Sequence, residues 1–192
     1  ALFRGGKRLG PIVPAKFHRL TEEELWSRLV ANRPQAVSGN RYRSVEAGLK
    51  SGSLAYSDRT YRFTKVPAAV SGATYLMTAN DDAGSRGDKF FAFAVAADST
   101  VYVGHDVRIA QKPKWMHVDG TGGFRDTGLV IETNDTKFRL FARAANPGIV
   151  NLGGNTDDGV ESGRSNYLVI IKPAELKLRS EPITMAGVLP RL

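Results

Sequence analysis

The sequence predicts a mainly β protein, an antiparallel β-sandwich or jelly roll with one N-terminal α-helix. Short apolar segments recur from Thr60 onward, with turn residues between them. Twenty glycines and nine prolines in 192 residues are typical of a chain with many turns. No helical segment separates the successive strands, whereas parallel neighbours need long connections that are usually helical. A parallel α/β sheet is therefore not expected.

A helix is predicted over residues 21–32, ahead of the strands. Thr21 suits the N-cap, and Glu24 three residues later completes the spacing of a capping box. Leu25 begins an apolar stripe at helical spacing, and Pro34 lies just beyond its end.

The predicted strands are rich in β-branched and aromatic residues and are bounded by turn formers. In 60–66, "TYRFTKV", Tyr61 and Phe63 alternate with Arg62 and Thr64, the period of a strand with one buried face. The other strand segments are 73–80, 89–97, 100–109, 127–133, 137–143, 148–154 and 166–173, with 176–180 as a further candidate.

Three parts are predicted along the chain: an extended basic arm (1–20), a helix and linker that pack on the sandwich (21–59), and the sandwich domain (60–192). The net charge is +8, and residues 1–19 carry five basic and no acidic side chains. Because the arm also carries apolar groups, it is expected to dock on a protein surface, either of another copy or of another subunit. The predicted docking residues are Phe3, Arg4, Lys7, Arg8 and Phe17.

Composition excludes several classes of site. The chain has no cysteine, which removes disulfides, thiolate metal sites and cysteine nucleophiles. The longest apolar run, 90–97, is far shorter than the ~20 residues that span a bilayer. The first residue is Ala rather than Met, as in a processed chain, so a secreted, periplasmic or cell-surface location is expected.

Catalytic motifs are weak in this sequence. The three histidines are scattered, and neither a G-x-S-x-G elbow nor a phosphate-binding glycine motif occurs. Glycoside cleavage by a pair of carboxylates stays an alternative, because the distance between two carboxylates depends on the three-dimensional structure. The sandwich region is nearly neutral and carries no RNA-binding motif, so nucleic acid is not an expected partner. A noncatalytic binding role is favoured over an enzyme.

An acid-rich loop, "TANDDAGSRGDKF" at 78–90, is a candidate metal site. Oxygen ligands at loop spacing suit Ca²⁺, although the glycine and the terminal Glu of an EF-hand are misplaced. A solvated hairpin loop is the alternative. The predicted calcium ligands are Asn80, Asp81, Asp82 and Asp88.

The stretch "YVGHDVRIAQKPKWM" at 102–116 is the candidate ligand site. A flat aromatic ring beside hydrogen-bonding side chains is the combination that sugar recognition needs. The predicted ligand-binding residues are Tyr102, His105, Asp106, Arg108, Lys114 and Trp115. The alternative is structural: Asp106 and Arg108 pair with each other, and Trp115 fills the end of the sandwich.

Residues 61–172 carry a series of motifs in a characteristic order. A strand of small and apolar residues precedes "VYVGHDVRI", which is followed by "KPKWM", "FRDTG" and a strand that closes in "LGGN". This order resembles that of galactose-binding-like jelly-roll accessory domains, of the carbohydrate-binding-module kind, in secreted bacterial polysaccharide-degrading enzymes. The resemblance implies a noncatalytic β-sandwich associated with sugar binding, and it does not cover residues 1–60.

The sequence thus favours a secreted or surface-associated carbohydrate-binding domain whose partner is a polysaccharide or glycan. A structural subunit of an extracellular assembly or filament, docking through residues 1–20, is the alternative from another class. An accessory domain from a longer enzyme chain is a third interpretation.

Overall fold

The computed structural model describes residues 3–4, 7–8, 34–120, 122–158 and 163–174. The predicted helix at 21–32, the docking residue Phe17 and the candidate strand at 176–180 lie outside the described residues. Two short strands, β1 (Phe3–Arg4) and β2 (Lys7–Arg8), pair antiparallel with each other. Docking through the arm stays a prediction.

The larger sheet has seven strands in the order β4-β6-β12-β8-β10-β9-β5, and all neighbours are antiparallel. The predicted antiparallel β architecture is therefore confirmed. In sheet order the strands are β4 (Arg43–Val45), β6 (Thr74–Met77), β12 (Leu168–Pro173), β8 (Ser99–Asp106), β10 (Lys137–Ala145), β9 (Arg125–Thr133) and β5 (Phe63–Lys65).

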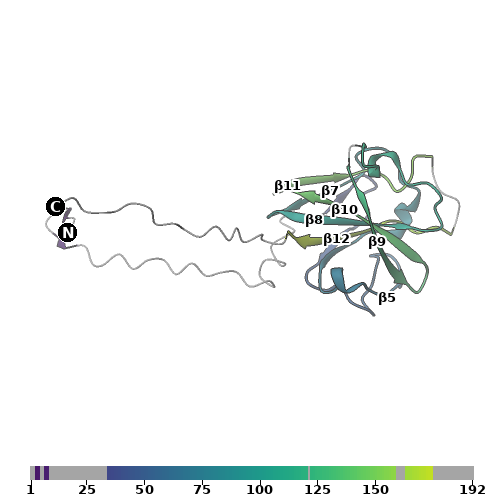
Figure 1. Ribbon diagram of the computed structural model, residues 1–192, viewed down its shortest axis with the longest axis horizontal. Helices are drawn as coiled ribbons and strands as arrows, with labels where there is room; N and C mark the ends of the chain where they lie inside the picture. Colours follow the sequence, from purple (N-terminus) through teal and green to yellow (C-terminus); the bar gives the residue numbers. More distant parts are fainter. Residues whose placement is uncertain (1–2, 5–6, 9–33, 121, 159–162, 175–192) are drawn as a thin grey trace, which may run out of the picture.

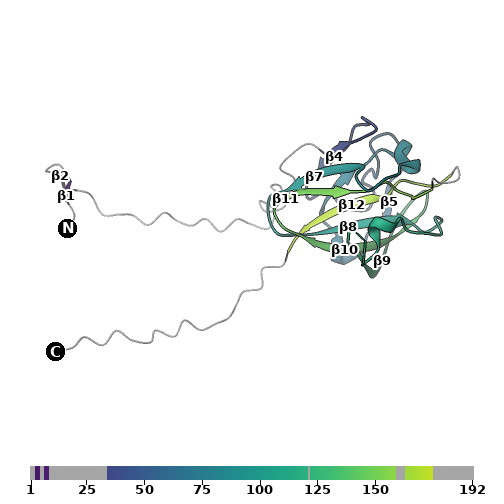
Figure 2. The ribbon, with the colours of Figure 1, turned by 90° about the horizontal axis from the view of Figure 1, so that it is seen from above.

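A smaller sheet covers part of one face of the larger one. It has the order β11-β7-β3, with β11 at Gly148–Leu152, β7 at Phe91–Val95 and β3 at Gln35–Ala36. Figure 1 shows β11 and β7 lying above β8 and β12, and Figure 2 shows the same layers from above. Three short 3-10 helices lie in the connections: η1 (Ala68–Val70), η2 (Asn80–Gly84) and η3 (Lys114–Met116).

The larger sheet is buried on both faces, and each face has its own hydrophobic core. The first core lies between the two sheets and includes Val101 and Val103 of β8 together with Phe91 and Phe93 of β7. The second core lies on the opposite face, where the connection 46–73 and β5 supply apolar side chains. Alternate residues of β12 enter the two cores, which accounts for its continuous apolar run "LVII".

The sequence predicts that the sandwich begins at Thr60, whereas strands ahead of Thr60 also belong to its sheets. β3 extends the smaller sheet and β4 forms an edge of the larger one. The buried ring of Tyr42 packs 4.6 Å from that of Phe91, measured between centroids. Because β3 and β4 have two and three residues, they are too short to show an alternating pattern. Among the described residues, no helix is long and apolar enough to cross a membrane.

Candidate functional site

The predicted stacking residue, Trp115, lies inside the first core. Its side chain is 3% exposed, and its indole N–H donates a hydrogen bond of 2.7 Å to the carbonyl of Gly154. The rings of Phe124 and Tyr167 meet it edge to face, at centroid distances of 5.6 and 6.1 Å. A ring enclosed in this way presents no free face to a sugar, so the structural alternative describes its position correctly.

Two glycines make room for Trp115. A Cβ atom at Gly153 would lie 2.3 Å from Cδ1 of the indole, and one at Gly122 would lie 2.3 Å from the Trp115 carbonyl oxygen. Both distances are far below van der Waals contact. The glycines of "LGGN" and of the segment before Phe124 therefore allow the tryptophan to pack, and the "KPKWM", "FRDTG" and "LGGN" motifs meet around one ring.

Asp106 and Arg108 form a structural cluster at the end of β8. The buried carboxylate of Asp106 accepts hydrogen bonds from the Arg108 guanidinium (2.7 Å at the closest), the Ser165 amide (2.8 Å) and the Thr136 hydroxyl (3.2 Å). Arg108 also bridges to Asp135 at 2.8 Å. Burial opposes ionisation of Asp106, but these hydrogen bonds outweigh it and hold the pKa below its usual value. The hydrogen-bonding capacity of this carboxylate is thus used within the fold rather than for sugar hydroxyls.

The structure does not gather the remaining predicted ligand-binding residues at one place. Tyr102 packs against the second core, whereas Trp115 lies in the first, so the larger sheet separates them. His105 is 4% exposed, and its Nε2 lies 3.3 Å from the Asn155 carbonyl oxygen. Lys114 is exposed, and its amide N–H donates to the Asp157 carboxylate. These six positions therefore form no common site.

Buried His105 makes the fold sensitive to mild acid. Burial lowers its pKa, so the folded protein binds this proton less tightly than the unfolded chain does. Its stabilising contribution is complete above about pH 6.5 and is lost as pH falls, at up to about 1.4 kcal/mol per pH unit. We expect urea unfolding at pH 7.5, 6.5 and 5.5 to show this decline in the wild type and not in His105→Gln. Exposed His117→Gln is the control, and a slope that persists in His105→Gln would contradict the assignment.

The predicted calcium ligands are also used within the fold. Buried Asp82 accepts hydrogen bonds from the hydroxyls of Ser38 (2.9 Å) and Tyr42 (2.8 Å) and from the Asn40 amide (2.8 Å). These contacts fix the β3–β4 connection to η2. Hydrogen bonds from the protein's own donors therefore hold the loop at 78–90 in place.

The other three predicted ligands do not join Asp82. The Asn80 side-chain oxygen accepts the Asn166 amide at 3.0 Å, Asp81 pairs with Arg59, and Asp88 is exposed. In the part of the chain that the structure describes, no three His, Cys, Asp or Glu side chains are placed to hold a metal ion. Binding of calcium through these four residues stays a prediction.

A groove of about 550 Å³ lies between the β8–β9 connection and strands β9 and β10. Its base consists of Phe124 and Phe141 of the first core, which are almost fully buried, and exposed Ala110 and Val118 supply its accessible apolar surface. Its polar lining consists of Gln111, Lys112, His117 and Asp126. We call this depression the loop groove.

The polar residues of the loop groove are held in place by neighbours. The ammonium of Lys112 lies 4.8 Å from the centroid of the Phe141 ring, and the Lys112 carbonyl oxygen lies 3.3 Å from Nε2 of His117. Asp126 accepts a hydrogen bond of 2.7 Å from Arg139. The pKa of Asp126 is lowered, mainly by the Gly128 amide, so the groove carries a carboxylate at neutral pH. The apolar surface and the charged rim together suit a polar ligand with an apolar face.

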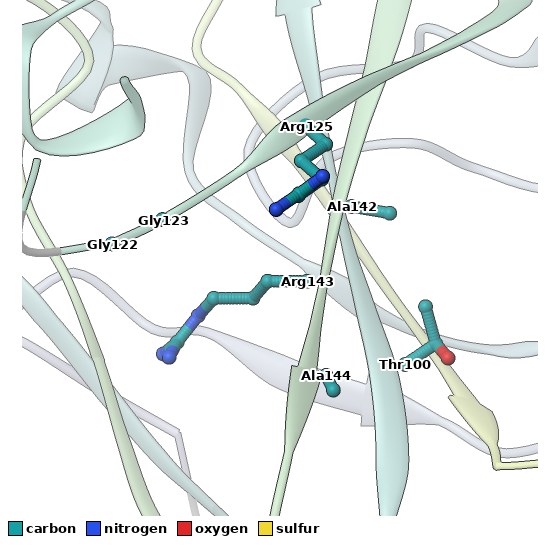
Figure 3. Close-up of a pocket in the computed structure, with 7 residues that line it drawn as sticks. All are labelled: Thr100, Gly122, Gly123, Arg125, Ala142, Arg143 and Ala144. Carbon is teal, nitrogen blue, oxygen red and sulfur yellow. The ribbon is translucent and has the colours of Figure 1, made fainter. Parts of the chain in front are cut away.

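A second depression, of about 430 Å³, lies beside the loop groove. Four of its lining residues are small: Gly122, Gly123, Ala142 and Ala144. Figure 3 shows the side chains of Arg125 and Arg143 reaching into the space between the Gly122–Gly123 segment and β10. We call this depression the arginine hollow. The Arg143 guanidinium lies 5.3 Å from the centroid of the Phe124 ring, and Phe124 also lines the loop groove.

The chain is similar to parts of larger enzymes. No family model matches the chain. A β-glucuronidase from Formosa agariphila is 23% identical over 141 residues, which are 73% of this chain and 14% of that protein. The chain therefore spans only a small share of the curated relative that it matches.

The structural comparison concerns the fold. A solved β-glucuronidase of glycoside hydrolase family 2 matches with a TM-score of 0.66 and 21% identity, over 75% of this chain and 15% of that chain. A GH138 enzyme that targets pectin rhamnogalacturonan II matches with a TM-score of 0.48 and 13% identity, over 76% of this chain and 17% of that chain. The chain has the fold of one part of a family 2 β-glucuronidase.

Proposed function

We propose that this chain is a noncatalytic, carbohydrate-binding domain of a glycan-acting enzyme, with a secreted or cell-surface location. The observation that carries the proposal is the match to a β-glucuronidase of family 2, in which a domain of this fold makes up 15% of the chain. The sequence similarity to 14% of a second β-glucuronidase supports it. The motif order over residues 61–172 supports an accessory role rather than a catalytic one.

The loop groove is the binding site in this proposal. A sugar ring has an apolar face of C–H groups and an edge of hydroxyls. The exposed apolar side chains of Ala110 and Val118 suit the first, and Gln111, Lys112 and Asp126 offer donors and acceptors for the second. Its volume of about 550 Å³ lies within the range of small-molecule sites.

Isothermal titration with a panel of oligosaccharides tests the site. For the oligosaccharides that bind, we expect Lys112→Ala and Asp126→Ala each to weaken binding about tenfold, because a hydrogen bond to a charged group contributes about 1.5–3 kcal/mol. Lys50→Ala is the matched control, because Lys50 is exposed and follows Leu49 of the second core, on the opposite face of the sheet. Equal affinity of all four proteins for every saccharide would remove the loop groove as the site, and absence of binding to the whole panel would refute the proposed function.

A further inference from the structure

The arginine hollow contains a cation that makes no ion pair with any residue that the structure describes. Arg143 is half-buried, and its Nε atom is buried with no hydrogen-bond partner among the described residues. Burial lowers its pKa, which means that the surroundings disfavour the charge. Arg125, the second guanidinium of the hollow, is exposed and takes part in none of the ion pairs among the described residues.

Three other arginines in the described part of the chain have carboxylate partners. Arg108 lies against Asp106 and Asp135, Arg59 against Asp58 and Asp81, and Arg139 against Asp126. In each case a carboxylate accompanies the guanidinium. A charged group withdrawn from water without such a partner costs free energy, which a bound anion would recover.

The contact with Phe124 does not supply an acceptor for the N–H groups of the Arg143 guanidinium. An aromatic ring attracts a guanidinium through its face, at 5.3 Å here. The N–H donors lie in the guanidinium plane and need acceptors at its edge. The small residues around them, Gly122, Gly123, Ala142 and Ala144, leave space for such an acceptor.

We propose that the arginine hollow binds the anionic group, a carboxylate or a sulfate, of an acidic saccharide that lies in the loop groove. This inference rests on the proposed function. Guanidinium groups pair with carboxylates and with tetrahedral anions through parallel N–H donors. The Arg143 guanidinium lies over the ring of Phe124, which also lines the loop groove, so a saccharide in the groove has this guanidinium beside it.

The test compares three oligosaccharide series of equal length: uronate-containing, sulfated and neutral. Their affinities are measured by isothermal titration for the wild type, Arg143→Gln and Arg125→Gln, with exposed Arg41→Gln as the control. We expect the wild type to bind one acidic series at least tenfold more tightly than the neutral series. Arg143→Gln should remove that preference and leave the neutral affinity within twofold, and the series that loses affinity identifies carboxylate or sulfate.

The outcomes separate this inference from the proposed function. If no series binds, the carbohydrate-binding function fails. If neutral and acidic series bind equally and neither arginine variant changes either affinity, the anion site fails while the function stands. Arg125→Gln, at an exposed position, keeps the test decisive if Arg143→Gln does not fold. Removing an uncompensated charge should leave the melting temperature of Arg143→Gln equal to or above that of the wild type, and a lower one would show that the cation serves the fold.

Discussion

Replacing Trp115 with alanine is expected to lower the free energy of unfolding by about 3–5 kcal/mol, the cost of emptying a buried aromatic site. The ring is 3% exposed and packs against Phe124 and Tyr167, and its N–H bonds to the Gly154 carbonyl. The measurement is urea unfolding followed by circular dichroism. A loss below about 1 kcal/mol would contradict the buried position and would suit the exposed ring that the sequence predicted.

Two further variants separate packing from hydrogen bonding at this site. Trp115→Phe keeps an aromatic ring but leaves the Gly154 carbonyl without its donor, which should cost about 1–3 kcal/mol. Gly153→Ala retains the tryptophan but places a Cβ atom 2.3 Å from its ring, so the ring or the backbone has to move. Both should reduce stability, and a stable Gly153→Ala would show that the "LGGN" glycine is not required for packing.

The fold was predictable because its signals are local. Each predicted strand from 60–66 to 166–173 overlaps a strand of the structure, since alternation and turn residues act over a few positions. β12 departs from alternation, and its apolar run reflects burial on both faces. The sequence did not predict β3 and β4 as separate strands, because two or three residues at a sheet edge carry no periodic pattern.

The candidate site was less predictable because exposure depends on distant residues. Trp115 follows charged side chains in a connection, where an exposed ring is a reasonable expectation. It is nevertheless buried, because the glycines at 122 and 153 leave space for it. In the same way, Asp106 and Arg108 have the residue types of a sugar site, but Ser165 and Asp135 take up their hydrogen bonds. The residue types were informative, whereas their partners came from parts of the sequence far away.

The loop groove and the arginine hollow have no sequence motif. Gln111 and Lys112 belong to the stretch that the sequence singled out, but no pattern distinguishes them from solvated loop residues. Arg143 reads as one of the polar residues of an alternating strand, "KFRLFAR". Its significance lies in the lack of a partner carboxylate among the described residues, which only the three-dimensional arrangement reveals.

Replacing Asp106 with alanine is expected to lower the free energy of unfolding by about 3–5 kcal/mol at pH 7, because the buried carboxylate is the acceptor for several donors, each of which costs about 1–3 kcal/mol when it is left unsatisfied. The Ser165 amide and the Thr136 hydroxyl would also lose their acceptor. Asp135→Ala is the matched control, since it removes the other carboxylate bound to Arg108 but at a more exposed position, and a smaller loss is expected. Urea unfolding of the three proteins measures the difference.

The pH dependence of the stability difference between wild type and Asp106→Ala shows whether the charge of Asp106 stabilises the fold. The pKa of Asp106 is below its usual value in the folded protein, so its contribution is complete above about pH 4 and is lost as pH falls through the folded pKa. The stability gap between wild type and Asp106→Ala should therefore narrow as the pH falls below about 4. A gap that stays constant over this range would mean that the carboxylate acts through shape and hydrogen bonding alone, and the ion pair with Arg108 would then not be what holds the end of β8 in place.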